Sequence, residues 1–420
     1  MLATALTGSF VLMPALTMQV WADETVNSDE TVIGSGGGTK GSTWDIADDL
    51  SVGLEGTGTL TISDGGEVSS GQAFVGRDDD GNGTVTITGA NSTWEIKTGN
   101  NLYLGSLGTG ATGTLVISNG GKLLLVRGLF ASLGAGSGGT GTVTVTGAGS
   151  SMDINALLSV GNYGAGTLTV SDGASVVVKG GAGTLHIALY GGSSGVLNIG
   201  DAAGEVAAAP GTIDAATISF GTGTGKLVLN HTDVNYVLDS NIIGAGVLEQ
   251  HSGTTVLTGN NTYSGGTTIS GGTLQIGNGG TSGSLSGNVT NYSALIFNRS
   301  DALSYTGDIS GAGSLTKAGA GTLTLTGANS HTGGTTISAG TLQIGDGGTS
   351  GSLTGNIVNN SALIFNRSDS LSYTGDISGT GSLTKSGTGT LTLTGRTVTP
   401  AVRPYPAARY KSAMAAPLAA

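Results

Sequence analysis

The sequence predicts an all-β fold, a right-handed parallel β-helix (solenoid) built from coils of short strands. Three observations predict it. Glycine supplies 80 of the 420 residues and charged residues only 10%, which disfavours helical domains because Gly, Thr and Ser are poor helix formers. Apolar residues alternate with Thr or Ser over short runs, the period of a strand with one buried face. The same strand-and-turn phrase recurs along the chain, as stacked coils require.

The composition also argues against several classes of function. The chain has 15 Lys and Arg against 27 Asp and Glu, a formal net charge of −12, which argues against nucleic acid and anionic membranes as partners. It has no Cys, so disulfides, thiol catalysis and Cys-bound metal are excluded. We expect no cofactor.

The first 22 residues are typical of an export signal. Leu2–Val20 is an apolar run broken by Pro14, and Val20-Trp21-Ala22 has the short side chains that a signal peptidase accepts. No Lys or Arg precedes Lys40, so the usual basic start is missing and a translation start upstream stays open. We expect a signal-peptide-like segment at 1–22 and a flexible lead at 23–39. We expect no membrane-spanning segment in the mature chain.

Residues 40–250 are predicted to form a β-helix with repeats of roughly 25–30 residues. A Gly-Thr-(Leu/Val) phrase starts at Gly58, Gly83, Gly113, Gly141 and Gly166, at intervals of 25, 30, 28 and 25 residues. A turn follows each copy, then a second short strand and often a third that ends in Gly, as in 74–76 and 103–105. A sandwich would place its strands in different environments and is not expected to repeat one phrase so faithfully.

Residues 251–395 are predicted to form a β-helix with a longer repeat. Leu257–Gly307 and Leu325–Gly375 are nearly identical, with a period of 68 residues that we interpret as about three coils. Such near-identity indicates duplication and not an active site. The residues expected to carry the repeat architecture are its glycines and threonines: Gly259, Gly266, Thr267, Gly272, Gly277, Gly327, Gly334, Thr335, Gly340 and Gly345.

This repeat resembles the passenger-associated transport repeat of autotransporters. The resemblance lies in Leu323–Asn329, Gly333–Ile337 and Gly340–Gly345, with a counterpart at Val256–Gly277. Phrases such as Gly83–Trp94 resemble other β-strand repeats of the same passengers, and together they cover most of the chain. The resemblance implies a secreted β-helical passenger exported through the outer membrane of a Gram-negative cell by its own C-terminal β-barrel. It also implies that the transport repeat assists folding or export, and many such passengers are adhesins.

Residues 396–420 depart from the repeat pattern. They hold four of the six prolines and no glycine, and they lack the alternating segments of about ten residues that barrel strands would show. Shifted by one base, their codons can be read as the continuing repeat, SHTGGTTISGGTLQIGNGGTSGS. We therefore expect an unstructured tail, frameshifted by the loss of one base near Gly395. The chain would then be the amino-terminal part of a longer passenger, which sequencing of the gene tests.

Candidate catalytic residues are sparse. The histidines His186, His231, His251 and His331 are scattered, and none stands in a HExxH motif or beside an evident nucleophile. His331 replaces the tyrosine of the other repeat copy, Tyr263, and is expected to be a surface substitution. The sequence therefore predicts no catalytic residue and no enzyme.

One acidic cluster is a candidate metal site. Asp78, Asp79, Asp80 and Asn82 offer oxygen ligands at a spacing loosely like that of Ca²⁺ loops. A closing Glu and further convergent ligands are missing, so a solvated turn between coils is favoured. Trp44 and Trp94 are expected to pack in the coils and not to stack on carbohydrate. Arg299, at the end of a repeated Ile-Phe-Asn-Arg motif, is expected to point outward.

The function that these observations predict is that of an exported, surface-exposed β-helical rod for adhesion or interaction. Its expected partner is a host-cell or matrix surface, or a second copy of the chain, acting through many weak contacts. The expected location is the cell surface or outer membrane for the full-length passenger, and the periplasm or medium for this fragment. Two alternatives stay open: a non-functional truncated remnant, and the scaffold of a passenger enzyme.

Overall fold

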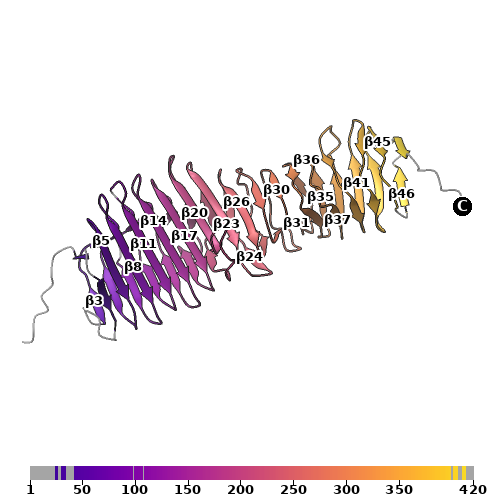
Figure 1. Ribbon diagram of the computed structural model, residues 1–420. Helices are drawn as coiled ribbons and strands as arrows, with labels where there is room; N and C mark the ends of the chain where they lie inside the picture. Colours follow the sequence, from indigo (N-terminus) through magenta and orange to yellow (C-terminus); the bar gives the residue numbers. More distant parts are fainter. Residues whose placement is uncertain are drawn as a thin grey trace, which may run out of the picture.

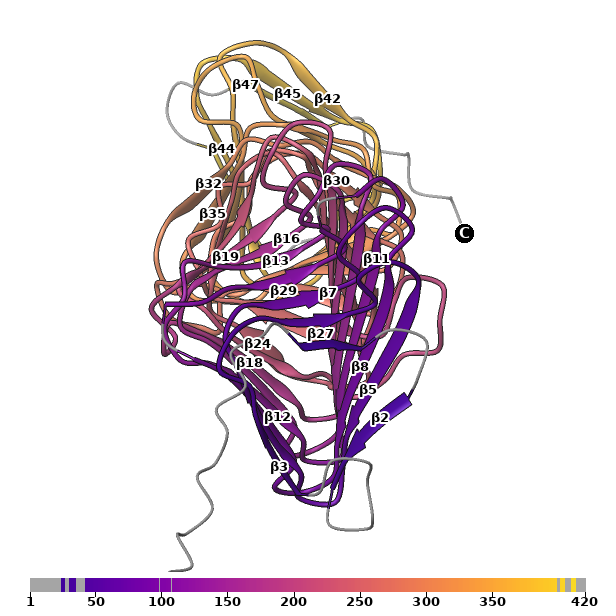
Figure 2. The same ribbon diagram turned by 90° about the vertical axis from the view of Figure 1, so that its left-hand side faces the viewer.

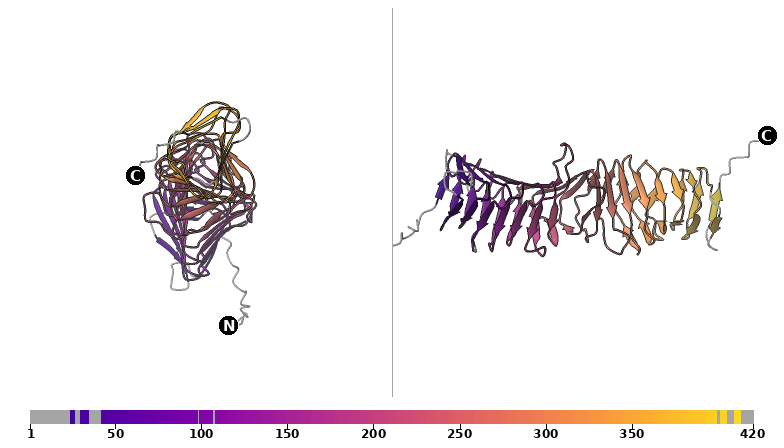
Figure 3. Two further views of the ribbon diagram at one scale, coloured as in Figure 1. Left: turned by 90° about the vertical axis from the view of Figure 1, so that its right-hand side faces the viewer. Right: turned by 90° about the horizontal axis from the view of Figure 1, so that it is seen from below.

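The protein is a long rod of stacked β-coils (Figure 1). The computed structural model describes residues 24–26, 30–34, 42–97, 99–106, 108–398, 401–404 and 409–412. Successive strands of each sheet come from successive coils and pair in parallel, so the predicted parallel β-helix is confirmed. Its first strand and its last lie at opposite ends of the rod (Figure 3).

Three sheets form the three faces of the first half, which encloses a three-sided interior when viewed along the axis (Figure 2). Sheet A contains β1 (Glu24–Val26), β4 (Leu50–Val52), β7 (Ala73–Val75), β10 (Leu102–Leu104), β13 (Phe130–Leu133), β16 (Leu157–Val160), β19 (Thr184–Ile187), β22 (Thr217–Phe220) and β25 (Asn241–Ile243). Sheet C contains β3 (Thr43–Asp45), β6 (Glu67–Ser70), β9 (Thr93–Ile96), β12 (Lys122–Leu125), β15 (Ser151–Ile154), β18 (Ser175–Val178) and β21 (Thr212–Asp214).

Sheet B is the longest and continues into the second half. It contains β2 (Glu30–Ile33), β5 (Thr57–Ile62), β8 (Asn82–Thr88), β11 (Thr112–Ser118), β14 (Thr140–Thr146), β17 (Ala165–Ser171), β20 (Ser194–Gly200), β23 (Thr224–Asn230), β26 (Val247–Ser252), β28 (Thr267–Ile269), β30 (Val289–Asn291) and β33 (Ile309–Ser310).

The second half adds two longer sheets and two small ones. The eight-stranded sheet contains β24 (Tyr236–Leu238), β27 (Thr254–Leu257), β29 (Thr273–Ile276), β31 (Ala294–Phe297), β34 (Ser314–Lys317), β37 (Thr335–Ile337), β40 (Ile357–Asn359) and β43 (Ile377–Ser378). The six-stranded sheet contains β32 (Leu303–Tyr305), β35 (Thr322–Leu325), β38 (Thr341–Ile344), β41 (Ala362–Asn366), β44 (Ser382–Ser386) and β46 (Ala401–Pro404). The small sheets pair β36 (Ala328–Asn329) with β39 (Ser352–Leu353), and β42 (Leu371–Tyr373) with β45 (Thr390–Leu393) and β47 (Arg409–Ser412).

The recurring phrase of the first half is stacked in register. Gly58 pairs with Gly83, Gly83 with Gly113, and Gly113 with Gly141 in sheet B. The Leu or Val two residues after each glycine points inward and is fully buried, as at Leu60 and Leu115. Burying one such side chain stabilises the fold by about 1.5–3 kcal/mol, so the interior aliphatic stack follows directly from the repeated phrase.

The 68-residue repeat corresponds to three coils plus one further face, not to the whole number of coils that we expected. Thr273–Ile276 lies in the eight-stranded sheet, whereas its sequence equivalent Thr341–Ile344 lies in the six-stranded sheet. Similarly, β28 lies in sheet B but its equivalent β37 lies in the eight-stranded sheet. Each copy therefore continues on the next face of the rod. The three faces accept the same strands because each asks only for alternate inward apolar residues.

Two expectations about the ends need correction. The expected flexible lead at 23–39 contains β1 and β2, which pair with β4 and β5. The expected unstructured tail at 396–420 contains β46 and β47, which pair with β44 and β45. The outermost strand of a parallel ladder presents free N–H and C=O groups, and an adjoining extended segment can satisfy them whatever its composition. The signal-peptide-like segment 1–22 lies outside the described residues. None of the described residues forms a helix long and apolar enough to cross a membrane.

Candidate functional site

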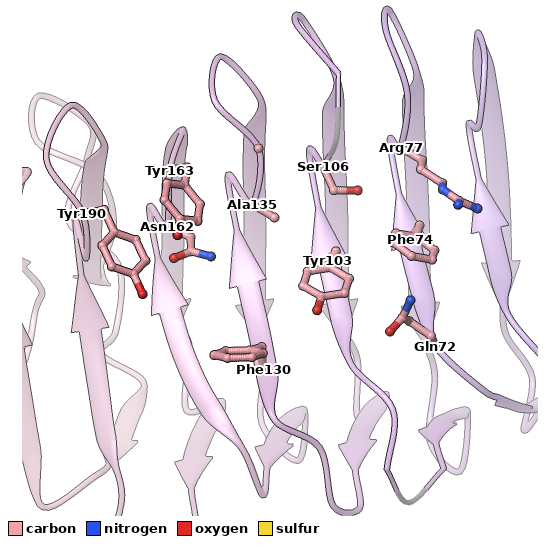
Figure 4. A pocket seen from close by; sticks show the side chains of 11 residues that line it. Gln72, Phe74, Arg77, Tyr103, Ser106, Phe130, Ala135, Asn162, Tyr163 and Tyr190 are labelled. Carbon is pink, nitrogen blue, oxygen red and sulfur yellow. The ribbon is translucent and has the colours of Figure 1, made fainter.

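The most prominent surface feature is a groove on the outer face of sheet A, with a volume of about 600 Å³. Five aromatic side chains from five consecutive coils line it: Phe74, Tyr103, Phe130, Tyr163 and Tyr190. Figure 4 shows these side chains following one another along the rod. We call this surface the aromatic groove.

The groove follows from the alternation within the short strands of sheet A. In β7 and β10 the outer residues of each triplet are buried, while Phe74 and Tyr103 between them occupy the outward position and pair in register. The next coil has Ser132 at this position. Each strand is followed by a residue with positive φ, a glycine in four of the five coils, as at Gly105, and Ala188 in the fifth. Glycine adopts this conformation without steric cost, and it turns the chain so that the following residues border the groove.

The aromatic rings form two stacked pairs. The centroids of Phe74 and Tyr103 lie 5.5 Å apart with 23° between the ring planes, and those of Tyr163 and Tyr190 lie 4.5 Å apart at 12°. The guanidinium carbon of Arg77 lies 4.4 Å from the centroid of Phe74. Phe74 is consequently buried, whereas Tyr163 is 52% exposed and Tyr190 44%. Stacking fixes the ring orientations, and pairs of this kind contribute about 0.5–1.5 kcal/mol each.

Polar atoms without a protein partner gather at the same place. Arg77 Nε, Ser106 Oγ and Asn162 Oδ1 all belong to residues that line the groove, and none has a hydrogen-bond partner among the described residues. Ser106 is only 3% exposed. Arg77 Nε lies 3.9 Å from Asp78 Oδ1, an ion-pair distance that is too long for a hydrogen bond. Burial raises the pKa of Tyr103, against the opposing effect of a hydrogen bond with Asn101, so its phenol stays neutral.

The acidic cluster lies in a turn before β8. Asp79 Oδ1 accepts hydrogen bonds from the backbone N (2.8 Å) and Oγ1 (3.2 Å) of Thr109 in the next coil. Asp80 has a φ of 61°, and Asn82 begins β8. Within the described part of the chain, no group of three or more His, Cys, Asp or Glu residues is arranged to hold a metal ion.

The repeat glycines and threonines lie at corners and close contacts of the second half. Gly266, Gly272 and Gly277 have positive φ values, and so do their equivalents Gly334, Gly340 and Gly345. At Gly259 an added Cβ would lie 2.1 Å from Ser240 O, and at Gly327 it would lie 2.2 Å from Gly307 O. Thr267 and Thr335 begin β28 and β37 and are buried.

His331 is not at the surface, which corrects the expectation from the sequence. It is fully buried, and its Nε2 lies 3.0 Å from Thr335 Oγ1. In the preceding copy the buried Tyr263 hydroxyl makes the equivalent contact with Thr267 Oγ1 at 2.6 Å. Position 331 is thus interior in both copies, and a histidine was accepted because it can retain this hydrogen bond.

Arg299 also differs from the expectation that it points outward. Its guanidinium bonds to both carboxylate oxygens of Asp301, at 2.8 and 2.7 Å, and Nη1 donates to Gly283 O. Only 14% of its side chain is exposed. The repeated arginine therefore fastens a loop of the coil. Trp94, as expected, packs in the interior, where its Nε1 donates to Ser70 Oγ at 3.1 Å.

The structure brings together three residues that the sequence did not connect. His251 Nε2 lies 3.0 Å from Glu249 Oε2, and its Nδ1 lies 3.0 Å from Ser270 Oγ. This order resembles a nucleophile, base and acid chain. However, the backbone N–H groups of Ser270 and Gly271 both donate to Gln250 O and so are not available to stabilise an oxyanion. The site also lies outside the aromatic groove.

Sequence reasoning missed the aromatic groove because no motif marks it. Its rings come from five coils at unequal spacing, and two of them, Tyr163 and Tyr190, lie in turns and not in strands. The available signal was the alignment of the third strand of each coil, which would have placed Phe74 and Tyr103 side by side on one outward row.

Comparisons with known proteins agree with the fold. The family described as Passenger-associated-transport-repeat matches residues 252–276, 315–344 and 383–399. The chain is 42% identical over 192 residues to the Adhesin BmaC autotransporter of Brucella suis biovar 1 (strain 1330), covering 41% of this chain and 6% of that protein. It is 34% identical over 181 residues to the uncharacterized lipoprotein YdeK of Escherichia coli (strain K12), covering 41% of this chain and 13% of that protein.

A third relative is the uncharacterized protein YuaQ of Escherichia coli (strain K12), 28% identical over 218 residues that cover 49% of this chain and 14% of that protein. The chain therefore spans only a small part of each of these relatives. The stacked parallel strands, the transport-repeat matches and the similarity to an autotransporter adhesin together identify the chain as an autotransporter passenger domain that carries passenger-associated transport repeats.

Proposed function

We propose that this passenger is an exported rod that makes adhesive contacts at a cell or matrix surface, and that the aromatic groove is its contact site. The observation that carries the proposal is the groove itself, where exposed stacked tyrosines stand beside polar atoms that lack partners. Exposed aromatic patches with convergent polar groups are typical of binding sites. The similarity to an adhesin supports the same role.

Binding of the purified full chain to cultured host cells and to matrix-coated surfaces tests this proposal. A variant that carries Tyr163→Ala and Tyr190→Ala should bind several-fold less than wild type. Tyr292→Ala is the matched control, because Tyr292 is 59% exposed but belongs to the second half of the rod. Equal binding by all three proteins, with circular dichroism showing each to be folded, would reject the groove as the contact site.

The enzyme alternative rests on the Glu249, His251 and Ser270 chain, and we propose that this chain is structural. Lys226 Nζ lies 2.7 Å from Glu249 Oε1, so the carboxylate joins two neighbouring strands. Although burial opposes the effect, hydrogen bonds with Lys226 and His251 lower the pKa of Glu249. Ser270→Ala should leave any hydrolysis of p-nitrophenyl acetate unchanged. Loss of such hydrolysis in this variant alone would favour the enzyme alternative.

The remnant alternative rests on the shifted reading frame at 396–420. An immunoblot of surface and periplasmic fractions separates it from the adhesive rod. We expect the product in the surface fraction, whereas its absence from every fraction would favour a non-functional remnant.

A further inference from the structure

We infer that the aromatic groove binds an uncharged glycan whose pyranose units lie along the rod axis. This assignment rests on the proposed contact role of the groove and specifies its ligand chemistry. The groove crosses the five coils from β7 to β19, so at the usual spacing of about 4.8 Å between strands it extends roughly 19 Å along the axis. That length suits an oligosaccharide of several units better than a single small molecule.

The arrangement of the rings leaves room for sugar units. Small side chains, Ser132 and Ala135, separate the Phe74–Tyr103 pair from the Tyr163–Tyr190 pair (Figure 4). The C–H face of a pyranose packs against aromatic rings, and rings already fixed by stacking lose little conformational entropy when a ligand binds. The groove therefore offers preorganised apolar contacts at both ends of a space that is lined by small residues.

The polar atoms of the groove require a ligand with both donors and acceptors. Arg77 Nε can only donate, Asn162 Oδ1 can only accept, and Ser106 Oγ can do either. Neighbouring sugar hydroxyl groups can meet all three demands. An acyl chain would leave the three atoms without partners, which is costly when the site is desolvated. Proline-rich peptides also dock on aromatic grooves, but proline has no N–H to offer the Asn162 oxygen.

Charge narrows the class further. Arg77 is the only cationic residue that lines the groove, and Asp78 accompanies it at 3.9 Å. Sulfated glycans and nucleic acids are bound through clusters of Arg and Lys, whereas this chain carries a net charge of −12. Single-stranded nucleic acid does stack on aromatic side chains, but with a basic groove along its backbone. An uncharged glycan meets no such electrostatic penalty.

The first experiment measures binding of labelled full-length chain to an array of bacterial and animal oligosaccharides. Heparin, a single-stranded oligonucleotide and a proline-rich peptide serve as competing classes. We expect uncharged oligosaccharides to bind and the three competitors not to bind. Tyr163→Ala should weaken binding of the strongest uncharged oligosaccharide about three- to tenfold, the loss of one aromatic contact. Asn162→Leu should weaken it as well, and Tyr292→Ala should not.

The second experiment treats the cells used in the adhesion assay with mild periodate, which cleaves vicinal diols of surface glycans. We expect binding of wild type to fall to the level of the Tyr163→Ala, Tyr190→Ala variant. Groove-dependent adhesion that survives periodate, or array binding confined to heparin or to the peptide, would overturn the glycan assignment while leaving the adhesive role intact. Array binding of an uncharged glycan without any cell or matrix binding would instead reject the adhesive role alone.

Discussion

The buried His331 makes a quantitative prediction about acid stability. Burial lowers the pKa of its imidazole in the folded state, whereas the unfolded chain should titrate near 6.5. Below pH 6.5 the unfolded state therefore binds more protons than the folded state, so stability rises with pH and is lost as the pH falls. Between pH 7.5 and 5.5 this loss reaches about 1.4 kcal/mol if the folded histidine stays neutral.

The test replaces this histidine by the residue of the other repeat copy, His331→Tyr. A tyrosine at this position can bond to Thr335 as Tyr263 bonds to Thr267, and it does not titrate in this range. The measurement is the free energy of local opening from hydrogen exchange of β37 at pH 7.5 and pH 5.5, because repeat proteins open locally.

Wild type should lose about 1.4 kcal/mol between these two values of pH and the variant about none, after correction for the intrinsic exchange rates. Burial also lowers the pKa of His231, but that residue is unchanged in both proteins, so comparing the two differences isolates His331. Equal acid losses in the two proteins would refute the assignment of a buried neutral imidazole.

Three further predictions concern the core and the corners of the first half. Leu168→Ala, at a fully buried position of β17, should destabilise its coil by about 2–5 kcal/mol in hydrogen exchange, while the outward Thr167→Ala should change it by less than about 0.5 kcal/mol. Ala188→Gly should stabilise by about 0.5–1 kcal/mol, because Ala188 has a φ of 52° and the left-handed strain exceeds the entropic cost of glycine; a lower urea midpoint would contradict this. Trp94→Phe should cost about 1–3 kcal/mol by leaving the buried Ser70 hydroxyl unpaired, and an unchanged melting temperature would show that this hydrogen bond contributes nothing.

Much of the architecture is written in the local pattern of the sequence. The alternation in phrases such as Gly83–Thr88 determines which side chains are buried, because successive residues of a strand face opposite sides. The repetition of the phrase determines the stacking, because each coil pairs best with a neighbour that has the same lengths of strand and turn. The family resemblance rests on the same local features, and the transport-repeat matches agree with it.

Only the tertiary structure decided where the repeats lie around the axis. The period of 68 residues is visible in the sequence, but whether it closes on the same face depends on the number of residues in each coil, which turns and loops of unequal length set jointly. The interior position of His331 depended in the same way on packing against other coils, since its polar side chain suggested exposure.

The aromatic groove shows the same division. Phe74, Tyr103 and Tyr163 are separated by about one coil or two in the sequence, and nothing in their local sequence says that they share one face. Stacking brings them together because strands of successive coils lie about 4.8 Å apart. The sequence by itself thus determined the strands, their inward sides and the coil-on-coil repetition. The tertiary structure decided which outward residues become neighbours, because that depends on the register between coils, a property that no single coil contains.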